Sequence, residues 1–166
     1  MLNKIAAAAA VGLLLSACVS TAKVQSTFDA KAAAYIHQKG SGRIEGQAFL
    51  RQRGGSVVKA AGETVHLIPA TRYALERFAA IYGERKSVFG GRQIQDTPPE
   101  YTQYMRSTKA DAEGRFSFDG IAPGRYLVQT QVYWAVPGSY IPEGAAFHER
   151  VEVGSGETVN VILSGN

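Results

Sequence analysis

The sequence predicts a mainly β protein, an antiparallel β-sandwich that carries one or two short helices. Three observations predict this fold. Apolar and polar residues alternate in several short segments, most regularly in 125–135. These segments recur at intervals of about ten residues, separated by turns that contain glycine or proline. The chain also contains 18 glycines, 8 tyrosines and 7 phenylalanines, a composition that suits short strands joined by tight turns.

Two segments have apolar residues at helical rather than alternating spacing. The first, 28–38, is alanine-rich, and Thr27 is expected to cap it. The second, 71–82, follows a capping residue, Thr71, and ends before Gly83. We expect the first helix to pack on the domain or to lie near a lipid surface. The second helix has one apolar face, with which it is expected to pack on the sandwich.

The other periodic segments alternate and are expected to be strands. The last two flank a glycine-rich turn at 154–157, a pattern that predicts a hairpin. Their valines and Leu163 are expected to share one core face. The stretches 51–62, 84–100 and 137–144 are expected to be loops, and a long ordered loop is often functional or mobile. The expected strands are 43–50, 63–69, 101–110, 115–118, 125–135, 147–153 and 158–163.

The N-terminal segment has the pattern of an export signal. Lys4 supplies a short positive region, and residues 5–15 are then entirely apolar. This apolar run is too short to cross a bilayer as a helix, which takes about 20 residues. We therefore expect residues 1–17 to be a signal peptide, 18–41 to be a lipidated tether with the short helix, and 42–166 to be the sandwich domain.

The residues that follow this apolar run, Leu15-Ser16-Ala17-Cys18, resemble the lipobox of bacterial lipoproteins. The resemblance implies that the thiol of Cys18 receives a diacylglycerol, that the chain is cut before it, and that the new amine is acylated. Cys18 is the only cysteine, so it cannot form an internal disulfide, and a free exported thiol is exposed to oxidation. Val19 is not the aspartate that retains lipoproteins at the inner membrane. The resemblance thus implies an outer-membrane lipoprotein that faces the periplasm.

Charge and motif spacing argue against several classes of function. The net charge of +4 is scattered along the chain, without a basic run, which argues against nucleic-acid binding. The three histidines, His37, His66 and His148, lack zinc-ligand spacing and are expected to be surface residues. Asp111 and Glu113 lack the further ligands of a calcium loop. No nucleophile elbow or phosphate loop occurs in the sequence. We therefore expect no metal, no cofactor and no catalytic residue, and hence not an enzyme.

The segment 108–126 resembles the signature of the carboxypeptidase regulatory-like domain family. In that family a threonine precedes Asp-x-x-Gly-x-Phe, and Gly-Leu-x-Pro-Gly-x-Tyr follows. Upstream, Gly46 and the run 61–69 resemble the family's opening strands. The resemblance implies a transthyretin-like sandwich over residues 42–163, with 71–104 as an insertion, in a domain that seldom has catalysis of its own. The matching residues are Thr108, Asp111, Gly114, Phe116, Phe118, Gly120, Pro123, Gly124 and Tyr126.

Aromatic residues in and after the longest strand suggest a second function. Trp134 with Tyr126, Tyr133 and Tyr140 would form a platform for a sugar. Alternation favours Tyr126 and Trp134 in the core, which leaves Tyr133 and Tyr140 at the surface. The first hypothesis is a non-catalytic, lipid-anchored envelope protein that presents its sandwich to a protein partner or the cell wall, with loop 83–104 as contact surface. The alternative is a carbohydrate-binding module of the cell envelope, and an enzyme with an unseen site is the third.

Overall fold

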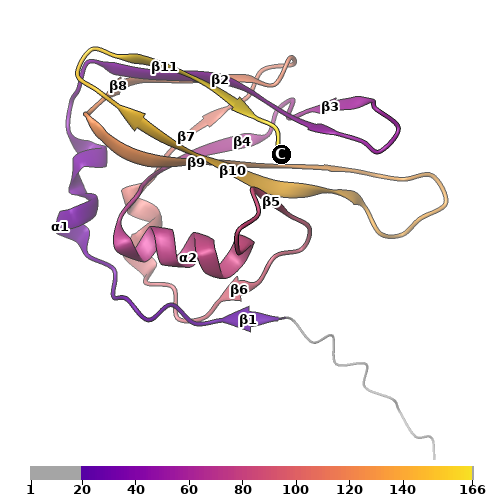
Figure 1. Cartoon of the computed structure of the whole chain (residues 1–166), viewed down its shortest axis with the longest axis horizontal. Helices are drawn as coiled ribbons and strands as arrows, with labels where there is room; N and C mark the ends of the chain where they lie inside the picture. The colour runs from indigo at the N-terminus through magenta and orange to yellow at the C-terminus, as the bar shows by residue number, and fades with distance from the viewer. Residues whose placement is uncertain (1–19, 166) are drawn as a thin grey trace, which may run out of the picture.

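The structure is a computed structural model that describes residues 20–165 of the chain. Its two main sheets pack face to face, with a helical layer on the outer side of one of them, and a small third sheet of two strands lies beyond this layer (Figure 1). The mainly β sandwich predicted from the sequence is confirmed. Within residues 20–165, no helix is both long and apolar enough to span a membrane.

The larger sheet contains five strands in the order β5-β10-β9-β4-β7, and every neighbouring pair in it is antiparallel. The long ladder between β9 and β10 forms its centre. The alternation over 125–135 correctly predicted β9, but β10 begins four residues earlier than expected. The strands are β4 (Thr64–Pro69), β5 (Ser87–Val88), β7 (Arg106–Lys109), β9 (Gly124–Trp134) and β10 (Glu143–Val153).

The smaller sheet is built around β2 (Gly42–Arg51). On one edge β2 pairs with β11 (Thr158–Leu163), and on the other with β8 (Arg115–Ile121) and then β3 (Val57–Lys59). The β11–β2 pair is parallel, and all other pairs in this sheet are antiparallel. The strand β3 lies inside the stretch that the sequence predicted to be a loop, because its short run lacks a clear alternation.

The hairpin expected at 154–157 is wrong. The turn carries the chain from β10 in one sheet to β11 in the other, and β11 pairs with β2 instead of β10. The Arg43 N–H donates to the carbonyl oxygen of Glu157 at 2.8 Å, which joins the end of the turn to β2. The Glu157 side chain closes the turn by accepting from the Gly154 N–H at 2.6 Å. A short glycine turn between alternating strands fits a hairpin and a crossing between sheets equally well.

The main core lies between the two sheets. Tyr126 and Phe147 of the large sheet and Ile44 of the small sheet are almost completely buried there. The core face predicted for the last two strands is confirmed even though the strands do not pair. Its members Val151, Val153, Val161 and Leu163 are buried in this core, and Val159 packs against it.

A second apolar cluster lies between the large sheet and α2 (Arg72–Tyr82). The helix begins after Thr71, whose hydroxyl accepts from the Ala74 N–H at 3.3 Å, and ends before Gly83, so this helix prediction is confirmed. The expected strand 101–110 is only half correct. Its first part, up to Tyr104, belongs to a 3₁₀ helix, η2 (Pro99–Tyr104), that follows Pro98, and β7 begins after this helix. The buried residues of this cluster are Ile68, Tyr73, Ala74, Phe78, Tyr82, Tyr101 and Leu127.

The segment before β2 lies against the helical layer. The strand β1 (Thr21–Ala22) pairs in parallel with β6 (Gln93–Ile94). The first helix is shorter than predicted: α1 (Ala30–Ala33) continues into a 3₁₀ helix, η1 (Ala34–His37). Its cap is Asp29 rather than Thr27, since the Asp29 carboxylate accepts from two backbone N–H groups of the first turn. Residues 21–27, expected to be part of a tether, lie on the domain, because β1 pairs with β6 and the Gln25 and Ser26 N–H groups donate to the Glu76 carboxylate. The expected signal peptide and Cys18 lie outside the described residues.

Candidate functional site

A large cleft lies at the end of the sandwich where two hairpins extend beyond the sheets (Figure 1). One hairpin joins β2 to β3, and the other joins β9 to β10. The cleft has a volume of about 1000 Å³. It is lined by residues 50–54 of the first hairpin and by 134–137, 139 and 141–145 of the second, together with Ser87, Phe89 and residues 164–165 near the C-terminus. Four segments far apart in the sequence thus meet around one concave surface.

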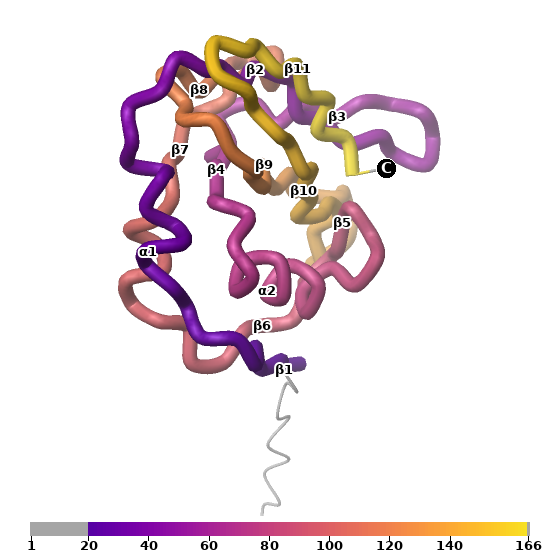
Figure 2. The backbone as a smooth tube through the Cα atoms, turned by 60° about the vertical axis from the view of Figure 1, so that its left-hand side comes forward, coloured from indigo at the N-terminus to yellow at the C-terminus, as the bar shows by residue number. Residues whose placement is uncertain are grey.

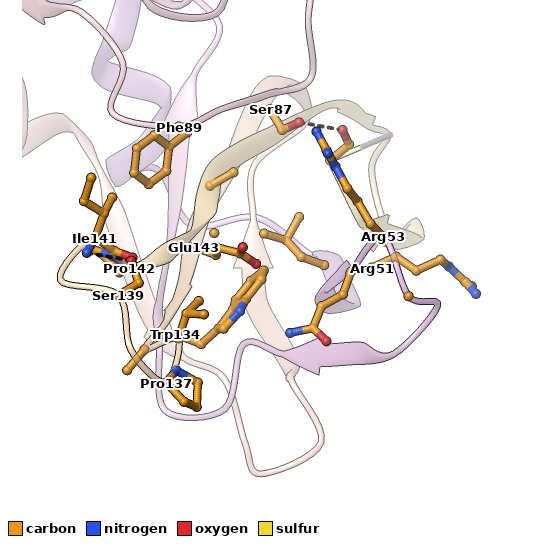
Figure 3. Close-up of a pocket in the computed structure, with 18 of the residues that line it drawn as sticks. Arg51, Arg53, Ser87, Phe89, Trp134, Pro137, Ser139, Ile141, Pro142 and Glu143 are labelled. Carbon is orange, nitrogen blue, oxygen red and sulfur yellow. Dashed lines mark hydrogen bonds between the residues drawn. The ribbon is translucent and has the colours of Figure 1, made fainter.

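Trp134 lies in the middle of this cleft (Figure 3). The alternation of β9 puts it on the same face as Tyr126 and Val132, so one side of the indole packs on the main core. Here the sandwich ends, and the rest of the ring lines the cleft, so that Trp134 is half-buried. A large flat ring with one supported side and one accessible side is suited to stacking against a ligand.

Polar residues also line the cleft that contains the indole. Arg51, Gln52 and Arg53 come from the β2–β3 hairpin, and Glu143 lies directly opposite Trp134 on β10. Figure 3 shows the two arginines on one side of Trp134 and Phe89 on the other. The ion pairs among residues 20–165 use other side chains, so Arg51, Arg53 and Glu143 are available to a ligand. The site therefore offers planar hydrogen-bond donors and a carboxylate acceptor around an aromatic surface.

The backbone at the base of the β9–β10 hairpin needs glycine. Gly144 has φ 137°, and a Cβ atom there would lie 2.0 Å from the carbonyl oxygen of Val132. Only glycine accepts this conformation and this close approach together. Gly144 thus keeps β9 and β10 in the register that places Glu143 across from Trp134.

The four aromatic residues considered as a sugar platform do not gather. Tyr126 is 1% exposed at the far end of β9, where its hydroxyl donates to the carbonyl oxygen of Ala122 at 2.7 Å. Tyr133 points to the opposite face from Trp134 and contacts Phe89 edge-on, with ring centroids 6.1 Å apart. Tyr140 is fully exposed and does not line the cleft. The predictions that Tyr126 is core and that Tyr133 and Tyr140 lie at the surface are confirmed, whereas Trp134, also expected in the core, is only half-buried because the sandwich ends there.

Sequence reasoning missed most of the side chains that accompany Trp134. Phe89 lies in the long loop 84–100, the one segment where a signal existed, because its length without periodicity suggested a functional loop. Arg51 and Arg53 belong to a polar hairpin with no motif. Their distance from Trp134 in the sequence gave no indication that they share a site.

The acidic pair of the signature segment serves the turn, as its composition suggested. The Asp111 carboxylate accepts from the N–H groups of Glu113 and Arg115, both at 2.8 Å, and these hydrogen bonds, led by that from Arg115, lower its pKa. Glu113 pairs with Lys59. Gly114 has φ 74° and lies so close to β2 that a Cβ would be 2.4 Å from the carbonyl oxygen of Ala48.

The histidines lie apart, and among residues 20–165 no three side chains of the metal-binding types gather. His37 is exposed, whereas His66 and His148 are partly buried. The surface expectation is wrong for His148, because β10 turns it toward α2. Its ring lies 4.3 Å from that of Tyr82, centroid to centroid, and its Nδ1 is buried without a hydrogen-bond partner. Burial lowers the pKa of His148, an effect that Glu149 partly offsets, and burial also lowers the pKa of His66.

Acidification is expected to destabilise the fold through these two histidines. A histidine with a lowered pKa in the folded state binds fewer protons there than in the unfolded chain, so stability falls as the pH drops below the unfolded value of 6.5. Urea unfolding between about pH 7.5 and about pH 5.5 measures this loss. His148→Gln should reduce the pH dependence, whereas the exposed control His37→Gln should keep it. An unchanged pH dependence in His148→Gln would contradict the assignment.

Comparison with solved structures gives an informative likeness. No family model and no curated protein matches the sequence. A crystal structure from Pseudomonas aeruginosa, described as that of a "putative carbohydrate binding protein", is similar in fold, with a TM-score of 0.70 and 27% sequence identity. The match covers 82% of this chain and 97% of that one. The minor pilin of Streptococcus agalactiae matches with a TM-score of 0.36 and 15% identity over 77% of this chain and 46% of the pilin, a likeness on which no argument rests.

Proposed function

We propose that the protein is a non-catalytic carbohydrate-binding module of the cell envelope, held at a membrane by lipid on Cys18. The cleft around Trp134 is the binding site in this proposal. The membrane is the outer membrane, and the domain faces the periplasm. The ligand is a glycan, and nucleic acid is not a partner.

The observation that carries the proposal is the half-buried indole with polar groups around it. A pyranose ring has an apolar face of C–H groups and a rim of hydroxyl groups. The indole of Trp134 matches the face, while Arg51, Gln52 and Glu143 match the rim with donors and an acceptor. The cleft, at about 1000 Å³, has room for more than one sugar ring, given the 300–1000 Å³ typical of small-molecule pockets.

The Pseudomonas protein supports the ligand class. It is described as a "putative carbohydrate binding protein", and 97% of that chain aligns with this one. The likeness includes enough identity, 27%, to extend beyond a shared architecture. A fold alone does not determine a function, so the proposal rests first on the cleft.

Two resemblances support the rest of the proposal. The carboxypeptidase regulatory-like signature coincides with structural features: the Asp111 turn, and Tyr126, whose hydrogen bond to Ala122 is similar to the tyrosine corner of β-sandwiches. The lipobox at Cys18 supports lipid anchoring and export. The resemblance to the carboxypeptidase regulatory-like signature agrees with a domain that does not catalyse a reaction.

Trp134→Ala is expected to abolish most glycan binding. Removing a central aromatic anchor costs about 2 kcal/mol or more, which is a factor of about 30 in affinity. Trp134 is the only tryptophan in the chain, so its fluorescence reports directly on the cleft. The measurement is a fluorescence titration of the purified chain with muropeptides from digested peptidoglycan and with neutral glucan oligosaccharides. A pull-down on insoluble peptidoglycan and glucan then compares the variant with the parent.

Tyr140→Ala is the matched control, because it also removes an aromatic ring from this hairpin but from outside the cleft. The control should bind as the parent does. Equal retention of parent and Trp134→Ala would place the glycan elsewhere. If the protein binds none of the glycans tested, the proposal is contradicted.

One observation favours protein interaction as a second candidate. Phe89, Tyr140 and Ile141 are 55%, 105% and 66% exposed, and the first of them lies in the loop 83–104. Such side chains are common in protein interfaces. Crosslinking in intact cells distinguishes the candidates: loss of a protein crosslink in Tyr140→Ser, a position outside the cleft, with glycan binding unchanged, would favour the protein partner.

A further inference from the structure

The chain between Cys18 and the first strand is very short. The Cα atoms of residues 18 and 20 are at most about 7 Å apart, whatever the conformation between them. At Ser20 the chain is already bound to β6, since its carbonyl oxygen accepts from the Gln93 N–H at 3.1 Å. The next hydrogen bond, from the Gln95 N–H to the carbonyl oxygen of Ala22, is 2.9 Å long. A lipid on Cys18 would therefore hold the domain by its β1–β6 edge.

The segment that follows β1 is also held against the domain. The Glu76 carboxylate of α2 accepts from the backbone N–H groups of Gln25 and Ser26, the latter at 3.0 Å. The ring of Phe28 then contacts those of Tyr73 and Tyr101, with centroids 5.8 and 5.6 Å away. The domain can move away from a lipid on Cys18 only if these contacts break.

The surface around Ser20 has the chemistry of a phospholipid headgroup contact. Ser20 lines a hollow of about 730 Å³ with the end of α2 and the loop 83–92. Arg85 and Arg92 supply two positive charges there, and Glu84 is the one acidic residue of the hollow. Phe89 also lines it and is 55% exposed. Guanidinium groups bind phosphate well, and an exposed aromatic ring suits the boundary between headgroups and hydrocarbon.

The residues beyond this hollow do not change its charge. Lys23 and Asp96, which follow β1 and β6, are both exposed and offset one another. Lys86 pairs with Glu149 at 2.7 Å.

We propose that this surface, formed by Ser20, Arg85, Phe89 and Arg92, lies directly against the phospholipid bilayer that holds the lipid on Cys18. The inference rests on the lipid anchoring in the proposed function. In both views β1 and β6 lie on the far side of α2 from the two sheets (Figures 1 and 2). The small sheet is then turned away from the membrane. The glycan cleft opens close to the membrane surface, because Phe89 lines both the cleft and the hollow.

The test measures how near each side of the domain comes to lipid headgroups. The lipidated full-length protein is reconstituted in vesicles of phosphatidylethanolamine and phosphatidylglycerol that contain a lipid with a quencher on its headgroup. A fluorophore is attached at Glu84→Cys, in the hollow, or at Ser155→Cys, in the turn between β10 and β11. The lipid blocks the sulfur of Cys18, so only the new thiol reacts. Quenching at position 84 should be about fivefold stronger, because the two sites lie on opposite sides of a domain roughly 35 Å across.

A longer linker between Cys18 and the domain provides the matched control. Twelve Gly-Ser residues inserted between Val19 and Ser20 span roughly 20 Å, enough to release the domain. The chain should still float with vesicles, and the difference between the two labels should largely disappear. Equal quenching at both positions in the chain without the insertion, with flotation intact, would overturn the apposition and leave the anchor standing. A chain that does not float with the vesicles would overturn both.

Discussion

Phe147→Ala is expected to lower the free energy of unfolding by about 4 kcal/mol, within the 3–5 kcal/mol range for phenylalanine truncation in a core. Phe147 lies near the middle of β10, between Thr130 of β9 and Ser87 of β5, and is 0% exposed. It fills the space between the two sheets, which are held apart by their own side chains and cannot close over the cavity. The loss is a large part of the 5–15 kcal/mol by which domains are normally stable.

Urea unfolding followed by Trp134 fluorescence measures this change. The midpoint should fall while the slope stays constant, since the surface exposed on unfolding is nearly the same. Phe89→Ala is the matched control, because it removes the same ring from a position that is 55% exposed. We expect it to lower stability by less than about 1 kcal/mol, the value of one aromatic pair. Similar losses in both variants would show that the sandwich core is not where the structure places it.

Cys18→Ser is expected to abolish lipid attachment completely. A hydroxyl is a far weaker nucleophile than a thiolate and does not take the place of the thioether that the lipobox resemblance implies. Each buried CH₂ group contributes about 0.8 kcal/mol to membrane binding, so one acyl chain binds marginally and two or more bind stably. The substitution therefore removes the whole anchor rather than weakening it.

Incorporation of radiolabelled palmitate and the mass of the purified chain measure the effect. The unsubstituted chain should carry label and begin at residue 18 with the mass of its acyl chains added, and Cys18→Ser should carry none. Ser16→Thr is the matched control, since threonine is also common at that lipobox position. Palmitate incorporation that is equal in the parent and in Cys18→Ser would remove the lipoprotein assignment, and with it the inferred membrane surface.

The local features of this protein follow from the sequence alone. The alternation of β9 gave its inner face correctly from Tyr126 to Trp134, because successive side chains in a strand must point to opposite sides. Thr71 and Gly83 fixed the ends of α2 through capping and backbone freedom. Asp111 fixed its turn through two hydrogen bonds to neighbours within four residues. Each of these interactions joins residues close in the chain, so a short stretch of sequence contains all of its determinants.

Only the tertiary structure decided which segments meet. Alternation told which side of β11 is buried but not that it pairs with β2 instead of β10. Nothing in residues 21–27 indicated that they lie along β6 and α2 and shorten the expected tether. The cleft joins Trp134 to Arg51 and Phe89, which no local pattern connects. Side-chain periodicity defines faces, whereas partners are chosen by the packing of whole sheets, and that choice depends on contacts between residues distant in the chain.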